Sequence, residues 1–113
     1  MSKVTFTSLM FAFVGMLFVG LSIPLIQNRV PPNRYYGFRT ARTLGDPKIW
    51  YEVNHISGTD LFLAGIIIAI SSLTTLTLAQ NWTNERVTLM LLLIMVFSLL
   101  GVVWHGFRVL NRI

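Results

Sequence analysis

The sequence predicts an all-α integral membrane protein that crosses the bilayer three times, with a short amphipathic helix in the membrane interface within the first loop. Hydrophobic residues make up 54% of the 113 residues and charged residues only 12%, unlike a soluble globule. The apolar residues form three long blocks, whereas helices of a soluble protein would interrupt them with a polar face. A chain of this length fits a single membrane domain over residues 1–113.

The first predicted span covers residues 4–26, which contain no ionisable side chain. At about 1.5 Å per residue, a helix of this length exceeds the roughly 30 Å of hydrocarbon in a bilayer. A cleaved signal peptide is the alternative, but its apolar region would be about 7–15 residues long and would end at small residues. Ile23-Pro24-Leu25-Ile26 offers no such cleavage site, so we interpret the segment as a mature helix with Pro24 near its end.

The second and third predicted spans cover residues 61–79 and 87–108. Ser57 is predicted to cap the second span, and Asp60, at the third helical position, is predicted to complete a reciprocal capping box with it. Asp60 therefore needs no catalytic role. The polar turn at residues 80–86 is short, which predicts that the two spans form an antiparallel hairpin.

Small residues recur at close to i, i+4 spacing in the first two spans. They are Ser8, Ala12, Gly65, Ala69 and Ser72. This spacing lets two helices approach each other, and it predicts that the first two spans pack closely, with a ligand groove as the alternative.

Basic residues are divided unequally between the two sides of the membrane. With three spans, the first loop and the C-terminus share one side, and the N-terminus and second loop share the other. The first side holds Arg29, Arg34, Arg39, Arg42, Lys48, Arg108 and Arg112, and the second holds only Lys3 and Arg86. The positive-inside bias therefore predicts a cytoplasmic first loop and C-terminus and an N-terminus outside, with Trp82 and Trp104 as interface anchors.

Several chemistries are disfavoured by the composition. There is no cysteine, so disulfides, thiolate metal sites and cysteine nucleophiles are excluded. The net charge of +5 is interpreted as topogenic charge and attraction to anionic lipid headgroups, with no nucleic-acid partner. No ionisable residue lies at the centre of a span, which argues against a self-contained coupled transporter. His55 and His105 have no metal-site spacing, so we expect no metal, no cofactor and no enzyme activity.

The first loop, residues 27–60, is too long to be a mere connection. Asp46-Pro47 predicts the start of a short helix. The apolar residues that share one face of this helix are Ile49, Trp50, Val53 and Ile56. We expect the helix to lie in the membrane interface, with Lys48, Glu52 and His55 directed toward water.

Three arginines of the loop, Arg34, Arg39 and Arg42, are its most specific indication of a binding role. A guanidinium group can bind carboxylates, phosphates or carbonyls through two hydrogen bonds at once. The alternative is contact with lipid phosphate, which would retain the loop on the cytoplasmic side.

The order and spacing of these loop residues resemble the signature of the SdpI/YfhL family. The matching residues are Pro32-Asn33-Arg34-Tyr35-Tyr36-Gly37-Phe38-Arg39-Thr40, Arg42-Thr43-Leu44, Ile49-Trp50-Tyr51, and Asn54 with Gly58. The family's best-known member is a longer bacterial membrane protein that protects its cell from a secreted toxin. When toxin is bound, that protein recruits a cytoplasmic repressor to the membrane.

The resemblance implies a multi-pass protein of the bacterial cell membrane, acting in immunity to or sensing of a membrane-active peptide toxin, with a cytoplasmic regulator as a second partner. The candidate partner-binding or loop-bracing residues are Asn33, Tyr36, Gly37, Arg39, Thr40, Arg42, Trp50 and Asn54. As structural residues, Gly37 would form a turn, Trp50 an interface anchor, and Asn33 and Asn54 hydrogen-bonding braces. The alternative function is a small accessory subunit of a larger membrane complex. A second copy of this chain, in a homo-oligomer, is also a candidate partner.

Overall fold

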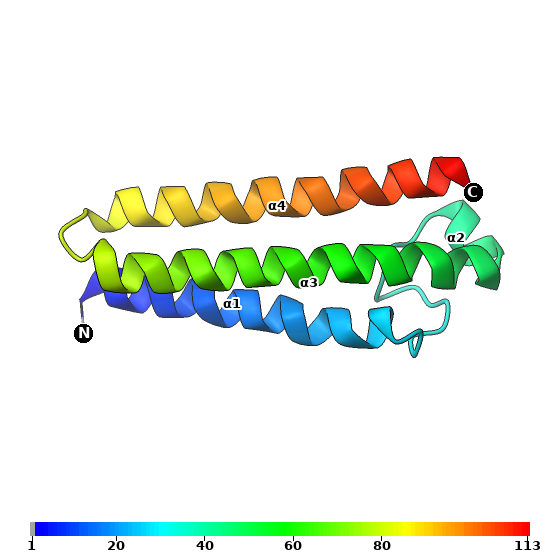
Figure 1. The fold of residues 1–113 in the computed structure, drawn as a ribbon, viewed down its shortest axis with the longest axis horizontal. Coiled ribbons are helices and arrows are strands. Elements are labelled where there is room, and N and C mark those ends of the chain that lie inside the picture. The colour runs from blue at the N-terminus through cyan, green and yellow to red at the C-terminus, as the bar shows by residue number, and fades with distance from the viewer. Residues whose placement is uncertain (1) are drawn as a thin grey trace.

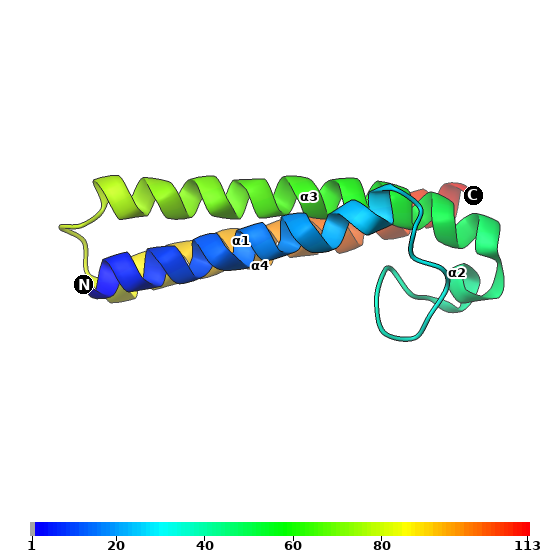
Figure 2. The same ribbon diagram turned by 90° about the horizontal axis from the view of Figure 1, so that it is seen from below.

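The computed structural model describes residues 2–113, which form three long helices and one short helix. The helices are α1 (Lys3–Ile26), α2 (Ala41–Gly45), α3 (Pro47–Leu78) and α4 (Asn84–Arg112). α1, α3 and α4 lie side by side in an elongated bundle, and the described residues form no strand (Figures 1 and 2). This architecture confirms the predicted all-α fold with three helices long and apolar enough to cross a membrane.

The two ends of the bundle differ in what they carry. The N-terminus and the α3–α4 turn lie at one end, whereas α2, the start of α3 and the C-terminus lie at the other (Figure 1). The bundle measures 51 × 23 × 19 Å. Its length exceeds the hydrocarbon thickness of about 30 Å, so part of the bundle must extend beyond the hydrocarbon.

α1 and α3 approach each other until their backbones touch. A Cβ atom added to Gly15 would lie 2.7 Å from the carbonyl oxygen of Gly65. In the same interface the hydroxyls of Ser8 and Thr75 are hydrogen-bonded at 2.7 Å. The predicted close packing of the first two spans is therefore confirmed, although the closest contact involves Gly15, which was not among the predicted residues. Close approach matters here because lipid removes the hydrophobic driving force for helix association, which leaves packing and hydrogen bonds.

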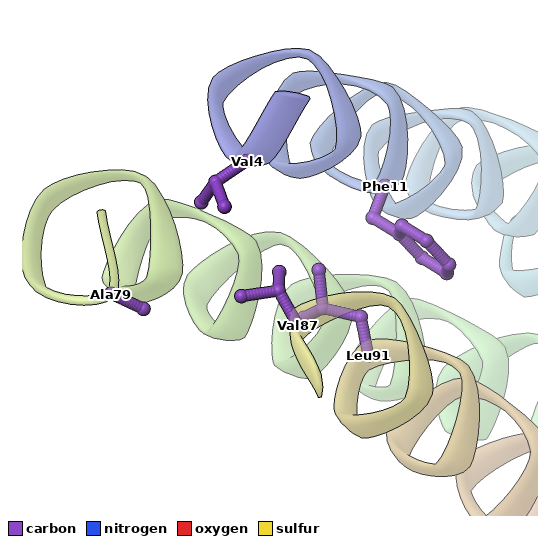
Figure 3. Close-up of a cluster of buried hydrophobic side chains, with 5 residues drawn as sticks. All are labelled: Val4, Phe11, Ala79, Val87 and Leu91. Carbon is purple, nitrogen blue, oxygen red and sulfur yellow. The ribbon is translucent and has the colours of Figure 1, made fainter. Parts of the chain in front are cut away.

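A cluster of buried apolar residues near the N-terminus joins α1, α4 and the C-cap of α3 (Figure 3). Its buried members are Val4, Phe11, Ala79, Val87 and Leu91. The α3–α4 turn next to it ends at Thr83, whose hydroxyl accepts from the Arg86 N–H at 3.2 Å and so caps α4. The short turn therefore produces the antiparallel hairpin that the sequence predicted.

The predicted boundary between an interfacial helix and the second span is wrong. The helix does start at Pro47, but α3 continues without a break through Ser57. Gly58 lies inside this helix and allows α1 to approach closely, since an added Cβ would lie 2.8 Å from the Cβ of Leu25. Continuous backbone hydrogen bonding is also strongly favoured where a helix enters lipid. Ser57 therefore caps no helix, and Asp60 has another contact, described below.

Candidate functional site

The connection between α1 and α3 carries most of the candidate residues. It comprises residues 27–46, and not 27–60 as predicted, because residues 47–60 belong to α3. We call residues 27–46 the signature loop. It folds back toward the bundle beside the first turns of α3 (Figure 2).

Asn33 shapes the first half of the signature loop. Its Oδ1 accepts hydrogen bonds from the backbone N–H groups of Tyr35 and Tyr36 at 2.9 and 2.8 Å. Its Nδ2 donates to the carbonyls of Pro31 and Tyr36 at 2.8 and 3.1 Å. The amide thus directs its hydrogen bonds to nearby backbone, as Asn side chains commonly do in turns.

Gly37 occupies a position that requires glycine for two reasons. Its φ is +117°, which L side chains rarely adopt. In addition, an added Cβ would lie 2.8 Å from Oδ1 of Asn54 and 3.1 Å from the Trp50 ring. The backbone of the signature loop therefore lies directly on α3 at this point.

Asn54 joins the signature loop to α3. The side chain is buried in the third turn of the helix. Its Oδ1 accepts from the Phe38 N–H at 2.6 Å, and its Nδ2 donates to the carbonyls of Phe38 and Trp50 at 3.3 and 3.0 Å. One side chain thereby satisfies both backbone polar groups of Phe38, which would be costly to bury unpaired.

Trp50 is fully buried, so its predicted role as an interface anchor is wrong. Its indole N–H donates to the carbonyl of Val30 at 2.7 Å. The neighbouring apolar face of α3 is also covered by protein and not by the membrane interface, because Val53 packs in a cluster with Val109 and Leu110 of α4. Lys48, Glu52 and His55 are exposed, as expected for the opposite face.

Thr40 and Arg42 lie at α2, a helix that the sequence did not predict. Thr40 and Thr43 form a reciprocal capping box in which the Thr40 N–H donates to the Thr43 hydroxyl at 2.7 Å. The guanidinium of Arg42 donates to the carbonyl of Leu110, in the last turn of α4, at 2.7 Å. Arg42 therefore tethers the signature loop to the end of α4.

Arg39 and Tyr36 are the two candidates without hydrogen bonds from their side chains to other residues in the range 2–113. The Arg39 side chain is exposed on the surface of the signature loop. The Tyr36 hydroxyl is buried, and the burial raises the pKa of its phenol above the usual value. The structure thus brings Gly37, Trp50 and Asn54 together. Asn33 bonds only within its own segment of the signature loop, and Arg39 lies outside the group.

Two contacts between α4 and the rest of the protein were not predicted. The Phe38 ring meets the Phe107 ring edge-on, with centroids 5.1 Å apart. Nδ1 of His105 lies 2.5 Å from Oδ2 of Asp60. Within residues 2–113, no group of three or more His, Cys, Asp or Glu side chains is placed to hold a metal ion. Asp60 and His105 are 45 positions apart in the sequence, so no local sequence pattern could predict their contact.

The comparisons with known proteins agree with the signature. The model of the SdpI/YfhL protein family matches residues 29–105. An uncharacterized protein of Bacillus subtilis (strain 168), YfhL, is 37% identical over 57 residues, which cover 48% of this chain and 48% of that protein. The chain thus aligns with about half the length of this relative. No solved structure matches the chain. With more than half of its residues matched and three apolar helices, the chain is a membrane protein that belongs to the SdpI/YfhL family.

Proposed function

We propose that the protein provides immunity to, or senses, a membrane-active peptide toxin, and that its signature loop presents Arg39 to a cytoplasmic regulator. The observation that carries this proposal is the contrast between the Arg39 backbone and its side chain. Both backbone groups of Phe38 are bonded to Asn54, and the Thr40 N–H is bonded to Thr43, so Arg39 is held on either side. Its side chain is nevertheless exposed.

An exposed arginine on an ordered backbone favours recognition of a binding partner. A guanidinium group offers a planar set of donors that matches a carboxylate or phosphate. Because the backbone around Arg39 is already ordered, binding through it loses less conformational entropy than binding through a flexible loop. An acidic surface of a cytoplasmic regulator is the partner that this group would recognise. The proposed role involves no catalysis and no cofactor.

The proposed orientation places the signature loop in the cytoplasm of a bacterial cell and the N-terminus outside the cell membrane. The signature loop and the C-terminus lie at the same end of the bundle, opposite the N-terminus (Figure 1). That end carries seven of the nine basic residues, which supports attraction to anionic headgroups on the cytoplasmic side.

Cysteine labelling tests this orientation, since the native chain has no cysteine. Cysteines placed at Ser2 or Asn81 are expected to react with a membrane-impermeant maleimide in intact cells. A cysteine at Leu44, which is exposed on α2, is expected to react only after the cells are permeabilised. Labelling of Leu44 but not Asn81 in intact cells would reverse the orientation.

Replacement of Arg39 tests the proposed recognition. Arg39→Ala is expected to abolish most of the protection against a peptide toxin encoded beside the gene, because the bidentate donor is lost. Arg39→Lys is expected to restore little of it, since lysine keeps the charge but not the planar fork. The measurement is survival of cells during toxin exposure, at membrane levels matched by immunoblot.

Arg112→Ala is the matched control, because Arg112 is exposed in the last turn of α4 and lies outside the residues matched by the family model. This control is expected to protect like the parent. Full protection by both Arg39 variants at equal abundance would refute the recognition role. The accessory-subunit function would then be favoured.

A further inference from the structure

A groove of about 360 Å³ separates the middle of α4 from α3 on the outside of the bundle. Its walls are Leu63, Ala64 and Ile67 of α3 with Ser98, Gly101 and Val102 of α4. Its end nearest the signature loop is lined by Asp60, Trp104 and His105. Asp60 is 18 residues from the end of α3 at Leu78, a distance of about 27 Å at 1.5 Å per residue, which places it close to a hydrocarbon boundary. The groove therefore has apolar walls along most of its length and a polar end at the depth of lipid headgroups.

The polar end offers hydrogen-bond acceptors. A carboxylate can only accept, so in the contact between Oδ2 of Asp60 and Nδ1 of His105 the proton belongs to Nδ1. Oδ1 of Asp60 and, in the neutral imidazole, Nε2 of His105 are then both left as acceptors. The two side chains are 21% and 43% exposed, so a molecule in the groove can reach them.

We infer that this groove binds a phospholipid whose headgroup carries a primary ammonium, with one acyl chain lying along the apolar wall. The ammonium would donate to Asp60 and His105, which it complements in charge and in donor capacity. The lipid phosphate would lie toward Arg108, whose guanidinium is 4.9 Å from the centroid of the Trp104 ring at the groove. A choline headgroup carries a similar charge but has no N–H group, so it cannot make these hydrogen bonds.

The test is competition between two phospholipids that differ only in the headgroup. The protein is purified in mild detergent and offered equal amounts of ethanolamine and choline phospholipids with identical acyl chains, and the retained lipid is identified by native mass spectrometry. The parent is expected to retain the ethanolamine lipid with about tenfold preference, as expected of one charge-assisted hydrogen bond. Asp60→Asn is expected to bring this preference close to equality.

Two glycine variants separate binding in the groove from lipid bound elsewhere. No atom would lie within 4 Å of a Cβ at Gly101 or at Gly20, so a side chain at either position starts in open space. Gly101 lines the groove, whereas Gly20 is exposed on α1. Gly101→Leu is expected to lose the selectively retained lipid, and Gly20→Leu is expected to retain it like the parent.

The inference is overturned if the parent retains the two lipids equally or retains neither. It is also overturned if a well-folded Gly101→Leu binds the ethanolamine lipid as the parent does, or if only a lysine-containing peptide, offered as a separate probe, is retained. Should Gly101→Leu elute as an aggregate, the headgroup preference of the parent and of Asp60→Asn decides the matter. The assay contains no toxin, so its outcome is independent of the proposed immunity function.

Discussion

Gly15→Leu is expected to destabilise the bundle strongly, whereas Gly20→Leu on the same helix is expected to be tolerated. A Cβ at Gly15 would lie 2.7 Å from the Gly65 carbonyl oxygen and 2.8 Å from the Ala69 backbone nitrogen. These are backbone atoms of α3, so the clash can be relieved only if α1 and α3 separate along their length. Separation would also remove the hydrogen bond between Ser8 and Thr75.

The expected loss of stability for Gly15→Leu is about 3 kcal/mol or more, at the upper end of overpacking effects. Thermal unfolding in detergent, followed by the loss of the monodisperse peak in size-exclusion chromatography, measures it. Gly20→Leu controls for added volume and hydrophobicity, because no atom would lie within 4 Å of its Cβ. Equal unfolding temperatures for the two variants would show that α1 and α3 are not held by close approach at Gly15.

Gly37→Ala is expected to release the signature loop from α3 while the three spans remain folded. The change places a side chain at φ +117° and directs its Cβ to 2.8 Å from Oδ1 of Asn54. The strain and the clash together cost about 2–3 kcal/mol, which exceeds what the hydrogen bonds between Asn54 and Phe38 return. We expect the signature loop to move away and the Trp50 ring to become accessible to water.

Hydrogen exchange measured by mass spectrometry checks this result. Amides of residues 30–43 and 49–56 are expected to exchange at least about tenfold faster in Gly37→Ala than in the parent, which corresponds to a local opening easier by 1.4 kcal/mol. Gly45→Ala is the matched control, because Gly45 ends α2 and an added Cβ would meet no atom within 4 Å. Unchanged protection in Gly37→Ala would mean that the loop does not depend on this contact.

The spans were predictable because they depend on local composition. Twenty or so apolar residues in a row form a helix in lipid whatever surrounds them. The start of α3 at Pro47 was equally local, since Asp46 caps it through the Lys48 N–H at 3.0 Å. The break expected at Ser57 was wrong, because a helix that enters lipid favours continuous backbone hydrogen bonding, and the small residue Gly58 serves the contact with α1 instead.

The site was predictable only where a side chain forms hydrogen bonds with residues close to it in the sequence. Asn33 is such a residue, since its partners lie within three positions. Trp50 is not, because its indole N–H bonds to Val30 and its ring lies beside Gly37, 20 and 13 positions away. α2 was missed because its capping box has Thr43 where the common motif has Glu or Gln.

The continuity of α3 has a mechanical consequence. About 20 of its 32 residues suffice to cross the hydrocarbon, so about 12 residues, or about 18 Å, project beyond it as the same rigid rod. A tilt of the spanning part by about 10° would displace the far end of this rod by about 3 Å, given its rise per residue. Trp50 and Asn54 sit on the projecting part and would carry the signature loop with them. Such a tilt would therefore move the signature loop, and Arg39 with it, because no break in α3 separates the membrane interior from this end of the helix.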